Sequence, residues 1–176
     1  MTSIPSAMAK SLHLASHFVI SCGTVTLDLG RAKVLLIRWR KTDEVILPKG
    51  RKNINESLQD AALRETWEET GHKAVLLPTS LPTLATGQHE CMLSYQEPIA
   101  VSQRTNNDVL KIIFWFSAAS DSTRCDHDRP IQEDEDYETI WASLSEYESL
   151  LTFEDDRRIA RLVVEAAAPH ISHQTS

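Results

Sequence analysis

Residues 47–77 read LPKGRKNINESLQDAALRETWEETGHKAVLL, and this stretch decides how the chain is expected to fold. Ser57, with Asp60 three residues later, fits the capping arrangement at a helix N-terminus. Gly71 fits the left-handed stop at a helix C-terminus. The stretch therefore predicts a helix over residues 58–70, preceded and followed by strands.

Three carboxylates gather near the end of this predicted helix: Glu65, Glu68 and Glu69. At about 100° per residue, Glu65 and Glu69 lie within about 20° of Leu58, and Glu68 lies at the flank. The glutamates thus continue the apolar stripe of the helix, where unpaired carboxylates are strongly destabilising. A divalent cation resolves the conflict, because Mg²⁺ and Mn²⁺ prefer carboxylate oxygens. For these three residues alone, a solvated face with ion pairs is the alternative.

The spacing of charged residues extends this pattern over 23 positions. Gly50 is followed after five residues by Glu56, and after seven more by the run RETWEETG at residues 64–71. The arrangement resembles the Nudix box, G-x5-E-x7-R-E-U-x-E-E-x-G-U, in which U is a bulky apolar residue. Thr66 and His72 depart from the box at its first and last U positions, which concern packing more than chemistry.

The resemblance implies an enzyme that hydrolyses a P–O–P bond with water, in which metal ions neutralise phosphate oxygens and position the water. It implies that Glu65, Glu68 and Glu69 bind Mg²⁺, with Mn²⁺ as the alternative, and that Arg64 orients the carboxylates. It implies a supporting position for Glu56. A further carboxylate outside the box often acts as base or extra ligand in the family, and the candidates here are Glu133, Glu135 and Glu138. A solvated loop is the alternative for those three residues.

Basic residues concentrate just before the box. Residues 31–52 hold eight basic residues against two acids, and six of the eight bracket the start of the box: Arg38, Arg40, Lys41, Lys49, Arg51 and Lys52. A single pyrophosphate needs one or two cations, so six favour a substrate with four or more phosphates. A solvated strand face is the alternative. Arg104 and Lys111 are expected to add contacts, and Gly50 is expected to let the backbone turn sharply and approach the ligand.

Two Nudix groups look nearest in compactness and in this basic approach to the box: dinucleoside polyphosphate hydrolases and diphosphoinositol polyphosphate phosphohydrolases. The chain has PKGR at residues 48–51, where the diphosphoinositol group usually has a glycine-rich run. The choice between the two groups therefore stays open. An ADP-ribose or nucleotide-sugar pyrophosphatase and a catalytically silent binding module are the alternatives. Trp39 is expected either to stack on a nucleobase or to belong to the core.

The fold class expected from the pattern is α+β, a Nudix-type α/β/α sandwich with a mixed sheet. Strand-like segments occupy residues 17–29, 33–39, 44–48, 72–77, 97–104, 109–119 and 139–144. Two further helices are expected at residues 145–151 and 154–168. One domain over residues 17–168 is predicted, with an N-terminal extension (1–16) and a C-terminal tail (169–176).

Composition excludes several classes of protein. No apolar run approaches the ~18 residues of a membrane helix, and no signal-peptide core is present, so a cytoplasmic protein is expected, with the nucleus as the alternative. Three widely spaced cysteines suggest neither a disulfide framework nor a zinc site. The net charge of −7 disfavours stable nucleic-acid binding, whereas the local basic segment suits a small polyphosphate. The oligomeric state is left open.

Overall fold

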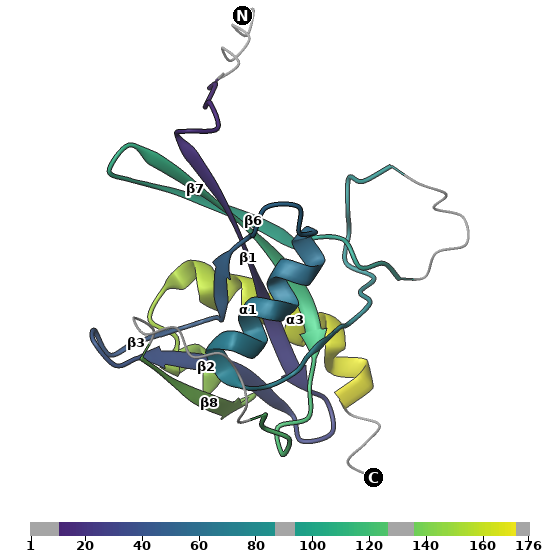
Figure 1. Ribbon diagram of the computed structural model, residues 1–176. Coiled ribbons are helices and arrows are strands. Elements are labelled where there is room, and N and C mark those ends of the chain that lie inside the picture. The colour runs from purple at the N-terminus through teal and green to yellow at the C-terminus, as the bar shows by residue number, and fades with distance from the viewer. Residues whose placement is uncertain (1–10, 87–93, 127–135, 172–176) are drawn as a thin grey trace, which may run out of the picture.

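The computed structural model describes residues 11–86, 94–126 and 136–171 (Figure 1). Its strands are β1 (Phe18–Asp28), β2 (Lys33–Trp39), β3 (Glu44–Ile46), β4 (Lys49–Arg51), β5 (Val75–Leu76), β6 (Ala100–Asn106), β7 (Val109–Ala119) and β8 (Tyr137–Ser143). Its helices are α1 (Leu58–Thr70), α2 (Tyr147–Leu150) and α3 (Glu154–Ile171).

These strands form one mixed sheet, as predicted. Its main path is β3-β2-β1-β7-β5, while β4 pairs with β1, β6 with β7 and β8 with β2. β1 and β7 are parallel along nearly their whole length, from Phe18 opposite Leu110 to Leu27 opposite Ala119. The remaining strand pairs are antiparallel. The short strand β4 pairs with β1 of this central pair, at Ser21 to Gly23.

Helices α1 and α3 cover opposite faces of the sheet, with α1 in front of β1 and α3 behind it in Figure 1. Val25 and Leu27 of β1 belong to the larger core, which includes Val163 of α3. Cys22 belongs to the smaller core, with Ala61 of α1. The α+β prediction of a sheet between helices is therefore confirmed. Within the described part of the chain, no helix is both long and apolar enough to cross a membrane.

Elements with strong local signals match their predicted bounds. Helix α1 covers residues 58–70 as predicted, because both of its ends are capped. The Ser57 side chain accepts a hydrogen bond from the Asp60 N–H, and Gly71 adopts the left-handed conformation with φ 76°. The β6–β7 hairpin turns at Asn107 and Asp108, which both have positive φ and fit a tight turn of the type that joins twisted strands.

Other bounds differ from the prediction: the strand expected at residues 72–77 is only β5 (Val75–Leu76), and the strand expected at residues 97–104 begins and ends later as β6. Two further differences have a clear local reason. Strand β4 was expected to be part of a loop, but it pairs with β1 where Gly23 permits close approach. A Cβ at Gly23 would lie only 2.6 Å from the Pro48 carbonyl oxygen. Helix α3 continues past its expected end to Ile171 and includes Pro169. A proline so near a helix end removes only one backbone hydrogen bond.

Candidate active site

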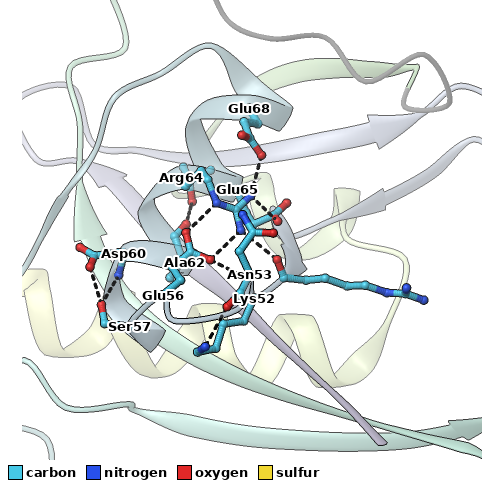
Figure 2. Close-up of polar contacts among 11 residues, drawn as sticks. Lys52, Asn53, Glu56, Ser57, Asp60, Ala62, Arg64, Glu65 and Glu68 are labelled. Atoms are coloured by element: carbon cyan, nitrogen blue, oxygen red, sulfur yellow. Dashed lines mark hydrogen bonds and ion pairs between the residues drawn. The ribbon is translucent and has the colours of Figure 1, made fainter. Parts of the chain in front are cut away.

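Arg64 lies at the centre of a network of box carboxylates (Figure 2). Its Nε donates to Glu56 Oε1 at 2.7 Å and its Nη2 to Glu56 Oε2 at 3.0 Å. Its Nη1 donates to Glu65 Oε1 at 2.6 Å and to Glu68 Oε2 at 2.7 Å. One guanidinium therefore orients three carboxylates at once, and planar, bidentate pairing of this kind is specific to arginine.

The same guanidinium ties helix α1 to the loop before it. Nη2 also donates to the Arg51 carbonyl oxygen at 2.8 Å, and the Asn53 N–H donates to Glu56 Oε2 at 2.8 Å. The hydrogen bonds from Arg64 are the main reason that the pKa of Glu56 lies below its usual value. Glu56 in turn raises the pKa of Arg64 above its ordinary value. Glu56 thus has the supporting position that the resemblance implied.

The inward orientation predicted for two of the glutamates is confirmed. The exposed fraction is 4% for Glu65 and 2% for Glu69, and Glu68 is less deeply buried at the flank. Glu69 Oε2 accepts a hydrogen bond from the Lys49 N–H at 2.7 Å. This bond joins the buried glutamate to strand β4, so the end of the box helix and the basic segment are in direct contact.

Gly50 makes room for a glutamate, and the sharp turn predicted there is wrong. Gly50 lies within β4 and pairs with Cys22 of β1. A Cβ on Gly50 would stand 1.7 Å from Glu65 Oε2. Any larger residue would therefore displace the Glu65 carboxylate, which explains the glycine by packing around the site and not by backbone freedom.

The chemistry of the donor set fits the divalent cation that the resemblance implies. Three carboxylates project from one helix, two of them buried, and hard cations such as Mg²⁺ prefer oxygen ligands of this kind. Among the described residues, no group of three His, Cys, Asp or Glu side chains gathers as a metal site would require. Glu65 and Glu68 are instead drawn to Arg64 Nη1. A cation at this place therefore competes with Arg64 for both carboxylates.

Both departures from the box have polar partners inside the protein. The Thr66 hydroxyl lies 2.7 Å from the Thr24 hydroxyl and donates to the Ala62 carbonyl oxygen at 2.8 Å. His72 Nε2 accepts from Trp141 Nε1 at 3.1 Å. Thr66 and His72 therefore secure α1 to β1 and β8 through hydrogen bonds, where the motif usually has apolar packing.

Four basic side chains gather around Lys111, which is one of them: Lys49, Arg51, Arg104 and Lys111. In the strand register, Lys49 and Arg51 pair with residues 23 and 21 of β1, and Lys111 pairs with residue 19. Arg104 pairs with Lys111 across the β6–β7 hairpin. Because paired residues share a face of a sheet, all four side chains lie on the face opposite α1. We call these four residues the cationic cluster.

Lys111 shows how closely the cluster is packed. Burial and, to a lesser extent, the charges of Lys49, Arg104 and Arg51 together lower the pKa of Lys111 to about 8, whereas Glu69 opposes the shift. Arg51, Arg104 and Lys111 also line a cavity of about 680 Å³ together with Asn106 and Asn107. A cavity lined by cations and amides suits a molecule with several phosphates.

The remaining predicted cations lie elsewhere. Arg38 pairs with Asp43 at 3.5 Å and with Glu138 at 3.8 Å, and Arg40 pairs with Asp136 at 3.4 Å. Lys41 is exposed in the turn after β2. Lys52 Nζ donates to the Asn53 carbonyl oxygen. The structure therefore brings Lys49, Arg51 and Arg104 together, but it does not bring Arg38, Arg40, Lys41 or Lys52 to them.

Of the three glutamates that were candidates for an additional base, the structure describes one. Glu138 lies on β8, where it pairs with Arg38. Glu133 and Glu135 lie outside the described residues, as does Cys91. No base is assigned from these three glutamates.

Sequence reasoning missed a second cavity beside the cationic cluster. It has a volume of about 460 Å³, and its walls include Trp39, Phe153, Asp155 and Asp156. The acids at the start of α3 were not among the predicted site residues. A useful signal was present in the sequence FEDD at residues 153–156, where an aromatic residue directly precedes adjacent acids.

Comparison with known proteins agrees with this architecture. The model of the NUDIX domain family matches residues 18–163. A NUDIX-family hydrolase from Clostridium perfringens is 22% identical, with a TM-score of 0.60, and the match covers 86% of this chain and 98% of that one.

Two further solved structures share the fold. A NUDIX hydrolase from Nitrosomonas europaea is 18% identical, with a TM-score of 0.58 and coverage of 82% of this chain and 86% of that one. An Ap4A hydrolase from C. elegans, in a binary complex, is 17% identical, with a TM-score of 0.57 and coverage of 86% and 98%. At these identities the structures support the fold alone. The family model and the box geometry together lead to one conclusion: the chain belongs to the Nudix family, as a hydrolase acting on phosphoric anhydrides.

Proposed function

We propose that this protein is a Mg²⁺-dependent pyrophosphohydrolase of a small molecule with several phosphates, a dinucleoside polyphosphate or a diphosphoinositol polyphosphate. One observation carries the proposal. The cationic cluster stands directly beside Glu69, because Lys49 belongs to the cluster and its N–H donates to Glu69 Oε2 at 2.7 Å. The cluster side chains project from the other face of the sheet, and Glu69 comes close enough to affect the pKa of Lys111, so phosphates held by the cluster would lie within the electrostatic reach of this carboxylate.

Each part of the site has a separate role in this proposal. Nudix hydrolases generally use divalent metals such as Mg²⁺, and Glu65, Glu68 and Glu69 are the residues that would hold the ion. When bound, the ion neutralises phosphate oxygens and lowers the pKa of the attacking water. Arg64 keeps Glu65 and Glu68 in place through hydrogen bonds of 2.6 and 2.7 Å.

The cationic cluster binds and orients the phosphates. Arg51 and Arg104 are exposed and can reach phosphate oxygens in solution, while Lys111 is half-buried between them. Such charge-assisted hydrogen bonds are short and directional. Four cations on one face exceed what one pyrophosphate can engage, so the cluster favours a longer phosphate chain. The name of the C. elegans relative, an Ap4A hydrolase, is compatible with this substrate class.

Two alternatives make different demands on the site. An ADP-ribose or nucleotide-sugar pyrophosphatase binds a single pyrophosphate, which does not require the additional cations Arg51 and Lys111. A silent binding module has no need for three glutamates and an arginine that orders them. The cationic cluster argues against the former, and the Arg64 network argues against the latter.

A substrate panel tests the proposal. Phosphate or nucleotide release is measured from diadenosine tetraphosphate, diphosphoinositol pentakisphosphate, ADP-ribose and capped RNA, with and without Mg²⁺. We expect Mg²⁺-dependent turnover with the highest kcat/KM on one of the first two compounds. Highest kcat/KM on ADP-ribose would favour the nucleotide-sugar alternative.

The variant Glu69→Gln tests the metal-binding assignment within the same panel. The substitution keeps side-chain size and removes a ligand charge, so turnover is expected to fall at least about a hundredfold while the circular dichroism spectrum stays unchanged. Glu165→Gln, on α3, is the matched control and is expected to keep wild-type activity. Wild-type turnover in Glu69→Gln would remove this residue from the site.

A further inference from the structure

The inner face of α1 changes character halfway along the helix. Its first half packs on the sheet through Ala61 and Ala62 of the smaller core. In its second half, the buried residues are all polar: Glu65, Thr66, Glu69 and Thr70. The part of the helix that carries the glutamates therefore contacts the sheet through polar side chains.

Three buried hydroxyl groups connect this polar face to β1. Thr24 and Thr26 belong to β1 and Thr66 to α1, and the exposed fraction of each is 0%. Thr24 Oγ1 lies 2.7 Å from Thr26 Oγ1 and 2.7 Å from Thr66 Oγ1. The Thr66 hydroxyl donates to the Ala62 carbonyl oxygen at 2.8 Å. We call these three threonines the hydroxyl chain.

Only one assignment of donors satisfies the hydroxyl chain, because each hydroxyl has a single proton. Thr66 uses its proton on the Ala62 carbonyl oxygen, so Thr24 must donate to Thr66. The proton of Thr24 is then occupied, so Thr26 must donate to Thr24. The hydrogen bonds therefore run in one direction, from β1 into the backbone of α1.

The following turn of α1 is held in a similar way. The Thr70 hydroxyl donates to the Thr66 carbonyl oxygen at 2.5 Å. From β8, the Thr139 hydroxyl donates to the Thr70 carbonyl oxygen at 3.0 Å. Hydrogen bonds are directional, whereas apolar contacts are not. These bonds therefore fix both the rotation of α1 about its axis and its position along β1.

Loss of one hydroxyl would leave another without a partner inside the protein. Without the Thr66 oxygen, the Thr24 O–H has no acceptor in the hydroxyl chain, and an unpaired buried donor is strongly unfavourable. A movement of α1 that gives this donor a new partner also moves Glu65 and Glu69. Both glutamates lie with Thr66 on the buried side of the helix.

We propose that Thr24 and Thr66 are positioning residues for the metal site: the hydroxyl chain fixes α1 on β1 and so holds the Glu65 and Glu69 carboxylates where a divalent cation would bind. The inference rests on the proposed function, in which these glutamates hold Mg²⁺. Removal of a group that orients a metal ligand directly weakens metal binding by about 10- to 100-fold. Thr24 and Thr66 act through the helix, so a smaller effect is expected.

Mn²⁺ binding in the absence of substrate tests the inference. The dissociation constant is measured by electron paramagnetic resonance on variants whose circular dichroism spectrum is unchanged. Thr66→Val keeps the shape of the side chain and removes the hydroxyl, whereas Thr66→Ser keeps the hydroxyl and removes the methyl group. Thr66→Val is expected to weaken Mn²⁺ binding about three- to tenfold, and Thr66→Ser to stay within about twofold of wild type. Positioning by shape alone predicts the reverse order.

The direction of the hydrogen bonds also predicts coupling between β1 and α1. Thr24→Val plus Thr26→Val removes both hydroxyls of β1, so Thr66→Val in this background leaves no donor of β1 unpaired. Its effect on the Mn²⁺ dissociation constant is then expected to be less than about twofold, because replacing both partners of a buried hydrogen bond by apolar groups is nearly neutral. The same three- to tenfold loss in both backgrounds would contradict the hydroxyl chain.

Thr79→Val is the matched control for loss of a buried threonine hydroxyl. Thr79 follows β5, lies outside the hydroxyl chain and accepts a hydrogen bond from the Leu81 N–H at 3.2 Å. This variant is expected to lose stability and to keep wild-type Mn²⁺ affinity.

Steady-state kinetics separate positioning of the metal site from substrate binding. Thr66→Val is expected to lower kcat, whereas its KM for a polyphosphate stays within about twofold of wild type. The reason is that the cationic cluster lies on the opposite face of the sheet from α1. A raised KM with unchanged kcat would contradict the positioning role.

Three results of the binding experiment would overturn the inference: wild-type Mn²⁺ affinity in Thr66→Val, weaker binding in Thr66→Ser than in Thr66→Val, or an equal loss in Thr79→Val. Failure of the proposed function gives a different result. Wild-type protein that binds Mn²⁺ without coupling between positions 24 and 66 would lose only the positioning role. Wild-type protein that neither binds Mn²⁺ nor turns over any compound of the substrate panel would contradict the proposed function itself.

Discussion

The basic segment before the box contributes to two regions with opposite electrostatic surroundings. Arg38 and Arg40, at the end of β2, are matched by carboxylates, since Asp43, Glu138 and Asp136 lie within 4 Å of them. Lys49 and Arg51, on β4, face further cations and the Glu69 carboxylate.

The cross-strand neighbour of a cationic side chain determines whether that side chain is available to bind a ligand. Arg38 is cross-strand partner to Glu138, so its charge is neutralised within the protein. Arg104 is cross-strand partner to Lys111, so each charge raises the local positive potential. A polyanion binds more favourably to the second arrangement, because it reduces the electrostatic repulsion between like charges that the fold holds close together. The predictions below test this difference.

Of the two regions, the cationic cluster is expected to give the larger effect. The double variant Arg51→Ala plus Arg104→Ala should lower kcat/KM for a polyphosphate substrate by at least about tenfold, since each charge-assisted hydrogen bond contributes about 1.5 to 3 kcal/mol. The loss for ADP-ribose should be much smaller. Steady-state kinetics at low and high salt check this, and screening should shrink the effect. Equal losses on both substrates would assign the arginines to the common pyrophosphate or to the fold.

Gly50 lies between the two β4 cations and connects the cluster to the box helix. Gly50→Ala should lower the unfolding free energy by about 1 to 3 kcal/mol, because the added Cβ overlaps the buried Glu65 carboxylate. Denaturant titration measures this change, and activity should fall with it. Gly30→Ala, in the exposed turn after β1, is the control. A Gly50→Ala protein with wild-type stability and activity would contradict the packing described around Glu65.

Lys111 makes the cluster sensitive to pH. Its pKa is lowered to about 8 from 10.5, so the side chain is charged below pH 8 and neutral well above it. Tripolyphosphate affinity should therefore fall about three- to tenfold between pH 7 and pH 9. Lys111→Arg stays charged throughout and should remove most of this dependence. Titration calorimetry at both pH values decides, and an identical fall in the arginine variant would assign the titration to another group.

The lowered pKa of Lys111 also predicts that the unfolding free energy rises with pH, whereas the tripolyphosphate affinity falls. Between pH 8 and pH 10.5 the unfolded chain binds more protons at Lys111 than the folded protein does. The unfolding free energy should therefore rise with pH through this window as far as Lys111 determines it. Comparison of wild type with Lys111→Met isolates that part, because the variant has no group to titrate. A wild-type slope in Lys111→Met would exclude Lys111 as its source.

The smallest effect is expected from Arg38 and Arg40, two of the six cations that the sequence predicted to bind phosphates. Arg38→Ala plus Arg40→Ala should change kcat/KM for a polyphosphate by less than about twofold, because exposed ion pairs contribute little and both side chains are occupied by acids. Kinetics on the same substrates measure it. A tenfold loss would show that Arg38 and Arg40 bind substrate phosphates despite their carboxylate partners, and would contradict the distinction between the two regions.

Features controlled by local sequence could be predicted, and those that depend on strand pairing could not. The capping residues Ser57 and Gly71 determine the two ends of α1 by local hydrogen bonds and backbone conformation. The angle of about 100° per residue predicted that Glu65 and Glu69 lie on the inner side of the helix. The pairing of Arg38 with Glu138 joins residues 100 positions apart, so charge counts in a window missed it. The cavity at the start of α3 likewise combines residues from Trp39 to Asp156.

The most direct test of the central claim is the dissociation constant of inorganic tripolyphosphate, measured by calorimetry at constant salt for wild type and the two double arginine variants. The cationic cluster beside Glu69 is the phosphate site in this account. Arg51→Ala plus Arg104→Ala should therefore weaken binding at least about tenfold, and Arg38→Ala plus Arg40→Ala should leave it within about twofold. The reverse order, or equal weakening in both variants, would contradict the account.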